Sequence, residues 1–225
     1  MGQYYKYMNI DKRIIVYAKY GHELCVHSWL GNNSVVIPIE QLVKTEWQGD
    51  RVIQLGEYAD EMAASTELRG EDLKFIKKIK KEVGMTNDQN LYLYWGYKVN
   101  GGETFKEYTL KELFDLYDLK LGQKCSCDQF RYLYNTKRKE YVDSFKILPS
   151  YVGEYKSEIN FVKLDAYSLL IAIGNGLGGG DYCGPDENLV GLWATTSDSI
   201  IISEKSPKEY AEENSEVENY TELVP

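Results

Sequence analysis

Short hydrophobic segments rich in Tyr, Val and Ile recur along the chain and are separated by polar turns. β-Branched and aromatic residues favour strands, and segments of this length bounded by turn residues are typical of them. Twenty tyrosines fit such a pattern, because a ring covers a half-buried sheet while its hydroxyl reaches water or a partner. The predicted strands are Tyr4–Met8, Ile14–Tyr17, Val52–Leu55, Leu91–Val99, Phe130–Tyr134, Tyr141–Phe145, Leu169–Ile173 and Ile200–Ser203.

Helical patterns are fewer. From Glu71 to Val83 the apolar residues recur at roughly helical spacing with lysines between them, and Gly84 follows as a C-terminal stop. Thr109 and Glu112 form a capping-box pattern ahead of an apolar run, which predicts a second helix.

Residues 34–43 are a weaker helix candidate, because Pro38 would lie inside the helix and proline is tolerated only near the first turn. Strands remain in the majority. The sequence therefore predicts an α+β fold, mainly antiparallel β-sheet with a few helices, in a single domain over residues 1–203.

Two parts of the chain resemble each other. Residues 4–9 with the polar turn 11–13 match residues 130–135 with the turn 137–139, and both indicate a hairpin. A Gly-Asn pair and then an aspartate leading a strand follow in the same order in both parts. The pattern favours half-repeats at 1–62 and 128–203 with a helical insertion between them. The alternative is coincidence among common turn residues.

Charge excludes one class of partner. The chain has 35 acidic and 26 basic residues, a formal net charge of −9, whereas a protein that binds a nucleic-acid backbone needs clustered Lys and Arg. No apolar run is long enough for a membrane span, and the N-terminus lacks the order of a signal peptide. We expect a cytoplasmic protein that binds neither nucleic acid nor membrane.

The last 22 residues, 204–225, hold seven glutamates against two lysines. A segment with few apolar residues and no periodicity does not bury enough surface to offset its ordering entropy. We predict a flexible acidic tail here.

The cysteines are too few for a disulfide scaffold, and free thiols are the expected state. Cys25 and His27, together with Cys125 and Cys127, would supply four metal ligands if the two pairs met, although structural zinc usually uses longer spacings. Cys183 would be a nucleophile if His22 or His27 served as its base. Both arrangements are weak alternatives, so we assign no metal, no cofactor and no catalytic residue.

Residues 174–184 are the most unusual stretch, with six glycines in eleven residues. Glycine allows a ligand to approach the main chain closely. A dinucleotide site would need a helix after the Gly-x-Gly-x-x-Gly pattern, but Pro185 and a strand-like segment follow, and Asp181 would repel a pyrophosphate. The loop remains a candidate site for some other small ligand.

Carboxylates and tryptophans near turns complete the candidate site. The carboxylates could include an acid–base pair, although aspartate in turns commonly caps its own backbone. The tryptophans could form aromatic platforms, although core packing is the expected use of at least two of the four. The candidate ligand-binding residues are His27, Trp29, Asp50, Glu57, Tyr58, Asn175, Asp181, Tyr182 and Trp193.

Six ordered motifs suggest a family. They are Met1–Tyr5, His27–Trp29, Gly49–Val52 with Gly56–Asp60, Tyr132–Asn135 with Glu140–Asp143, Gly174–Tyr182 and Val190–Ala194. Over residues 1 to about 203 the chain resembles an uncharacterised family of bacterial hypothetical proteins. That resemblance implies one shared site built by these motifs, and it implies no activity.

The sequence shows no recognised catalytic signature, and it has an acidic, Tyr-rich composition with an anionic tail suited to steering toward a basic partner. We therefore expect a non-enzymatic bacterial interaction protein that binds and neutralises or regulates a protein partner, of the immunity or anti-defence type. The alternative is a small-ligand-binding protein or hydrolase-like enzyme that uses the loop Gly174–Tyr182. Whether the chain is an enzyme stays open at this point.

Overall fold

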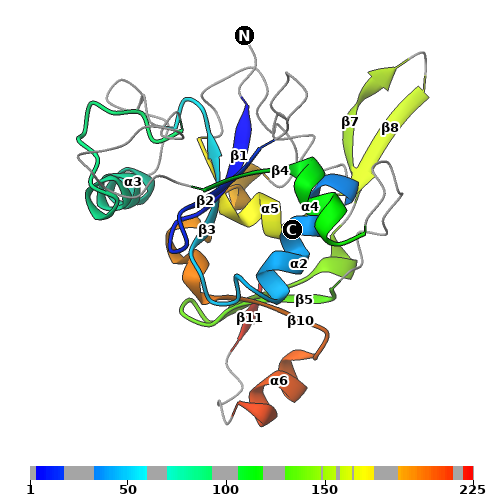
Figure 1. Ribbon diagram of the computed structural model, residues 1–225. Helices are drawn as coiled ribbons and strands as arrows, with labels where there is room; N and C mark the ends of the chain where they lie inside the picture. The colour runs from blue at the N-terminus through cyan, green and yellow to red at the C-terminus, as the bar shows by residue number, and fades with distance from the viewer. Residues whose placement is uncertain are drawn as a thin grey trace.

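The computed structural model combines helices with two mixed sheets, so the fold is α+β as predicted (Figure 1). The sheets contain parallel as well as antiparallel neighbours, which corrects the expectation of a mainly antiparallel system. No described helix has the length and apolar character that a membrane span requires. The structure describes residues 4–17, 33–59, 70–92, 106–118, 130–147, 149–155, 158–163, 165–174, 187–214 and 220–224.

Sheet A has five strands in the order β4-β2-β1-β3-β9. The central strand β1 runs antiparallel to β2 and β3, whereas β4 lies parallel to β2 and β9 lies parallel to β3. Its strands are β1 (Tyr5–Asn9), β2 (Ile14–Tyr17), β3 (Val52–Gly56), β4 (Lys106–Thr109) and β9 (Ala172–Ile173).

Sheet B has four strands in the order β10-β5-β6-β11. Strand β5 runs antiparallel to β6 and β10, and β11 lies parallel to β6. A separate antiparallel hairpin projects from the rest of the molecule (Figure 1). The strands are β5 (Tyr132–Asn135), β6 (Glu140–Asp143), β10 (Ile200–Ser203) and β11 (Thr221–Glu222), with β7 (Pro149–Tyr155) and β8 (Glu158–Lys163) in the hairpin.

The three helices predicted from the sequence are present. Gly84, at φ +78°, follows α3, and the Thr109–Glu112 capping box is present at α4. The weaker candidate is also a helix, α2, which contains Pro38. The α-helices are α2 (Asn33–Lys44), α3 (Gly70–Glu82), α4 (Leu110–Leu116), α5 (Ala166–Ile171) and α6 (Pro207–Glu213), and the short 3-10 helices are η1 (Ser144–Lys146), η2 (Glu187–Leu189) and η3 (Ala194–Ser199).

The two sheets repeat one connectivity. In each, a hairpin is followed by a third strand antiparallel to the first strand and by a fourth strand parallel to the second. The registers also agree: Asn9 lies opposite Ile14 and Val52 in sheet A, and Asn135 lies opposite Glu140 and Ile200 in sheet B. Strands β1, β2, β3 and β4 therefore correspond to β5, β6, β10 and β11.

The hairpin turns agree in detail. The Asn9 side chain accepts a hydrogen bond from the Lys12 N–H at 2.9 Å, and Asn135 accepts one from the Arg138 N–H at 3.0 Å. The fourth residue after each asparagine has positive φ, 54° at Arg13 and 55° at Lys139. These features are compatible with the predicted halves. The correspondence also includes β4 and β11, which lie outside 1–62 and 128–203.

Three hydrophobic clusters give the molecule its layers. The outer face of sheet A packs against α3, and the outer face of sheet B packs against α6. The largest cluster lies between the two sheets and includes residues of α2 and α5. Figure 1 shows the same arrangement, with α3 and α6 at the periphery and α2 and α5 in the interior. The inner faces of the two sheets thus share one hydrophobic cluster.

The prediction of a strand over Leu169–Ile173 is wrong for most of its length. Asp165 caps the N-terminus of α5 by accepting the Ser168 N–H at 2.7 Å, and only Ala172 and Ile173 are extended. A strand was also predicted over Leu91–Val99, of which residues 93–99 lie outside the described residues and residues 91–92 are not in a strand.

Residues 204–214 and 220–224 also differ from the predicted flexible tail. Ser206 and Glu209 form a capping box with proline at the start of α6, and such a box stabilises a helix N-terminus. Tyr210 is buried against sheet B, and β11 pairs with β6. A few apolar residues are sufficient to order this segment, because Tyr210 packs against the tyrosines on the outer face of sheet B.

Candidate functional site

The nine candidate residues divide into two groups. Asp50, Glu57, Tyr58 and Trp193 are described by the structure. The others, together with the four cysteines and both histidines, lie outside the described residues, so the ligand site at Gly174–Tyr182 stays a prediction. The candidates outside the described residues are His27, Trp29, Asn175, Asp181 and Tyr182.

Asp50 and Glu57 lie at opposite ends of β3. The Asp50 carboxylate accepts a hydrogen bond from Asn9 Nδ2 at 2.8 Å and pairs with Lys12, whereas the Glu57 N–H donates to the carbonyl of Tyr4 at the other end. The strand between them spans roughly 13 Å. Because paired hydrolase carboxylates lie roughly 5–10 Å apart, these two do not form such a pair.

Trp193 is fully buried between the sheets. Its exposed fraction is 0%, and its indole Nε1 donates to Glu140 Oε2 at 2.7 Å. Glu140 also accepts a hydrogen bond from Arg138 Nε at 2.9 Å. Trp47 is buried in the same cluster. Two of the four tryptophans therefore have the expected core position, and a contact of Trp193 with a ligand remains a prediction.

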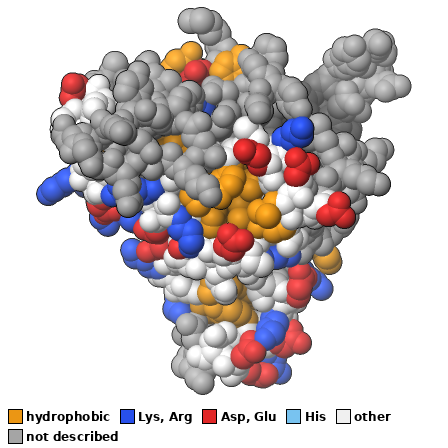
Figure 2. All heavy atoms as spheres, in the orientation of Figure 1, with side chains coloured by type: hydrophobic (Ala, Val, Ile, Leu, Met, Phe, Trp, Pro, Cys, Tyr) orange, Lys and Arg blue, Asp and Glu red, His pale blue; other side chains and the backbone are white. Residues whose placement is uncertain are grey.

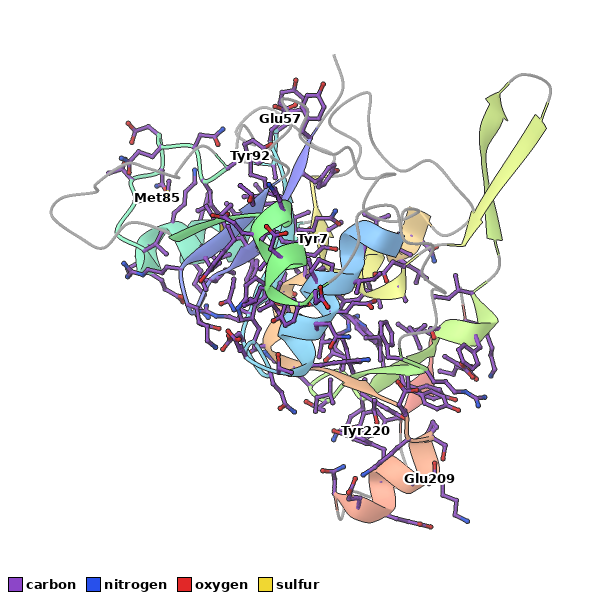
Figure 3. The ribbon with its side chains drawn as sticks, turned by 45° about the vertical axis from the view of Figure 1, so that its right-hand side comes forward. Tyr7, Glu57, Met85, Tyr92, Glu209 and Tyr220 are labelled. Atoms are coloured by element: carbon purple, nitrogen blue, oxygen red, sulfur yellow. The ribbon has the colours of Figure 1, made fainter. Side chains whose placement is uncertain are left out.

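A buried polar cluster lies where the inner face of sheet A meets α5. The Tyr7 hydroxyl is hydrogen-bonded to Ser168 Oγ, and Asp165 and Glu40 are buried nearby. Burial, and secondarily the charge of Asp165, raises the pKa of Tyr7 well above its usual range, and the same two causes raise the pKa of Tyr167. Figure 3 places Tyr7 near the centre of the molecule.

The raised pKa values favour the protonated form of both phenols, so neither is suited to act as a base or nucleophile. Within the described ranges, no group of three or more His, Cys, Asp or Glu residues could hold a metal ion. The sequence signal for the cluster is Asp165, an N-cap residue three positions before Ser168, and Ser168 directly precedes the segment predicted as a strand.

The buried phenols predict a loss of stability at alkaline pH. The pKa of Tyr7 in the folded protein lies above that of the unfolded chain, so the unfolded chain loses this proton first as pH rises. The contribution of this phenol to the free energy of unfolding is therefore complete below about pH 10 and is lost as the pH rises further. Denaturant unfolding at a series of pH values checks this, and Tyr7→Phe, which has no ionisable group, should show a shallower decline. An equally steep decline in Tyr7→Phe would contradict the assignment.

The end of sheet B carries an exposed cation between two aromatic rings. The guanidinium carbon of Arg131 lies 5.0 Å from the ring centroid of Tyr132 and 5.2 Å from that of Phe145. Arg131 also pairs with Asp143 at 3.4 Å, a hydrogen bond that raises the pKa of the guanidinium. Phe145 is 51% exposed. We call Arg131, Tyr132, Asp143 and Phe145 the arginine–aromatic site.

The hairpin between β5 and β6 positions this site. Arg131 directly precedes β5, Tyr132 is its first residue, and the register brings Asp143 opposite Tyr132. Asp143 then caps the short helix η1 by accepting the Phe145 N–H at 3.1 Å, which fixes the direction in which Phe145 leaves the sheet. Sequence reasoning identified both strands but assigned no role to Arg131 or Phe145, because exposure is not visible in a strand pattern.

The outer face of sheet B next to this site is covered with tyrosines. Tyr134 stacks on Tyr210 of α6 with centroids 4.3 Å apart, and Tyr220 meets both rings edge-on. The Tyr134 hydroxyl donates to the carbonyl of Lys205 at 2.7 Å. Figure 3 shows Tyr220 and Glu209 at the end of the molecule that α6 occupies. These contacts hold α6 in place beside the arginine–aromatic site.

The charged surface of α6 adds to the same end of the molecule. Figure 2 shows acidic and basic side chains side by side at this tip, with hydrophobic side chains just above them. Lys205 pairs with Glu213, and Lys208 with Glu212 at 3.9 Å. Both lysines therefore have carboxylate partners, and carboxylates remain in excess.

Comparison of the chain with protein-family models, with curated proteins and with solved structures finds no match in any of the three. The resemblance to a bacterial family therefore stays a prediction. Among the described residues, the surface of sheet B is the best candidate for a binding site. An exposed arginine and an exposed phenylalanine are in contact there, beside an acidic helix.

Proposed function

We propose that this chain is a non-enzymatic bacterial interaction protein that binds a protein partner through the arginine–aromatic site and thereby neutralises or regulates it. The observation that carries the proposal is the exposure of Phe145 and Arg131 on one hairpin. Arginine and aromatic residues contribute much of the binding energy of protein interfaces.

The geometry supports this use in a second way. The two rings and Asp143 hold the Arg131 guanidinium, so little side-chain entropy is lost when a partner binds it. A net charge of −9 favours a basic partner and accelerates encounter with it. Neutralisation then requires only that the bound protein cover a functional surface of the partner.

Partner capture with variants tests the proposal. We expect the full-length protein to retain a bacterial protein that the double variant Arg131→Ala/Phe145→Ala fails to retain. Two lost hot-spot residues each cost about 2 kcal/mol, or roughly 30-fold in Kd. Leu116→Ala is the matched control, because Leu116 on α4 is also a large exposed apolar residue, at 61% exposure.

Two results would contradict the proposal. One is that the wild-type protein retains no protein at low ionic strength. The other is that the double variant retains the same protein with unchanged affinity while circular dichroism shows an intact fold.

A further inference from the structure

The two sheets differ at one equivalent edge. In sheet A the outer edge of β3 is covered by β9, which pairs with it in parallel through Gln54 and Leu55. In sheet B, β10 is the counterpart of β3, and within the part of the chain that the structure describes it pairs only with β5. Among the residues that the structure describes, the edge that β9 fills in sheet A therefore carries no strand in sheet B.

The hydrogen-bond pattern identifies the backbone groups on this edge. Thr136 N–H donates to the carbonyl of Ser199 at 2.9 Å, so residues 199, 201 and 203 direct their backbone groups toward β5. Groups alternate along an antiparallel strand, so Ile200 and Ile202 direct theirs away from β5. The Ile200 N–H donates to the carbonyl of Ser197 at the C-terminus of η3. The Ile202 N–H and both isoleucine carbonyls face outward.

The side chains of β10 suit an added strand. Ile200 and Ile202 contribute to the core between the sheets, and Ile201 packs against the tyrosines of the opposite face. Ile201 and Ile202 are only partly buried. A neighbouring strand with β-branched residues would cover the remaining surface on both faces of the sheet. A run of three isoleucines on an open edge otherwise favours uncontrolled pairing.

The charges around this edge favour a basic strand. Residues 198–213 contain Asp198, four glutamates and two lysines, a net charge of −3. Symmetric pairing of two β10 edges would bring two such segments together, which like-charge repulsion opposes. A segment with lysine or arginine beside its β-branched residues meets complementary charge instead.

We infer that an extended segment of the protein partner, with alternating β-branched residues flanked by lysine or arginine, adds to sheet B alongside β10. It would lie parallel to β10, as β9 lies beside β3. The inference rests on the proposed function and deepens it, because it names the edge and the chemistry of the bound segment. Strand addition takes affinity from backbone hydrogen bonds and specificity from alternate side chains.

A synthetic peptide tests the inference on the full-length protein. The probe is fluorescein-labelled Lys-Thr-Val-Thr-Ile-Thr-Val-Lys, and its binding is followed by fluorescence anisotropy at low salt. Ile202→Pro removes the outward N–H without removing a donor from the β10–β5 ladder, so we expect about tenfold weaker binding. Ile202→Val is the matched control, because it keeps the N–H and should bind the peptide within about twofold of wild type.

A second measurement leaves the protein unchanged. Peptides N-methylated at alternate amides lose the donors of one edge at a time, so methylation of one set should abolish binding and methylation of the other should not. Equal effects of the two sets, or no binding of the unmodified peptide, would overturn strand addition. A dimer that Ile202→Pro dissociates in sedimentation analysis would also overturn it, because the edge would then belong to a second copy.

The outcome is separable from that of the proposed function. If a captured partner binds wild type and Ile202→Pro equally but is lost from Arg131→Ala/Phe145→Ala, strand addition fails and the interaction function stands. If wild type captures no partner, the proposed function fails, whatever the peptide does.

Discussion

Deleting residues 204–225 is expected to lower the free energy of unfolding by about 3–5 kcal/mol. The deletion removes Tyr210, whose burial contributes about 2 kcal/mol, and its stacking on Tyr134, which adds about 1 kcal/mol. It also removes β11 from the edge of β6 and Leu223 from the border of the core. A loss of this size is a large part of the stability of an ordinary domain.

Urea unfolding followed by circular dichroism measures this effect. Tyr210→Ala alone should produce more than half of it, whereas Glu212→Gln, which changes an exposed side chain of the same helix, should shift stability by less than about 0.5 kcal/mol. Unchanged stability after the deletion would mean that these residues do not pack on sheet B and that the flexible tail predicted from composition was the better description.

Replacing Trp193 by alanine is expected to cost about 3–5 kcal/mol. The indole is fully buried in the cluster shared by both sheets, and the substitution leaves a large cavity. It also removes the hydrogen bond from Nε1 to Glu140, although Arg138 still pairs with that carboxylate. Because the cluster joins the two sheets, the loss should appear as one cooperative transition at lower denaturant concentration.

Trp193→Phe separates the two contributions. It keeps most of the apolar contact and loses the N–H donor, so we expect a cost of about 1–2 kcal/mol. The measurement is again urea unfolding, followed by far-ultraviolet circular dichroism so that the lost tryptophan fluorescence does not interfere. If Trp193→Ala were as stable as wild type, the indole would not be a core residue, and an exposed aromatic platform would be the better assignment.

Local patterns predicted the parts of the fold that depend on local chemistry. The hairpin β1–β2 and its counterpart β5–β6 were both visible as apolar segments around polar turns, and the capping box at Thr109 marked α4. The similarity of the two hairpins was visible as well, because their turns use asparagine at the same place.

The mixed direction of the sheets could not be predicted in the same way. Strand β4 pairs in parallel with β2 and β11 pairs in parallel with β6, and in both cases the partners are about 80 or more residues apart in sequence. No local pattern encodes such a pairing. The acidic composition of the C-terminal segment predicted a flexible tail. The glutamates of α6 are on its exposed surface, however, and the packing of the helix on sheet B depends on Tyr210.

The candidate site illustrates the same limit. Asp50 and Trp193 were predicted as ligand-binding residues from their residue types. In the structure Trp193 is in the core and Asp50 pairs with Lys12 at a turn. Arg131 and Phe145 were unremarkable in sequence and became candidates only through their exposure and their mutual contact. A surface site built from residues of separate strands can be identified only when the three-dimensional positions of those residues are known.

The most direct test of partner binding through sheet B is residue-resolved amide hydrogen exchange of the full-length protein, alone and in complex with the partner it captures. We predict new protection at residues 130–147 and at the Ile202 amide, with little change at the equivalent residues 4–17 of sheet A. Protection confined to sheet A, or spread equally over both sheets, would contradict the account.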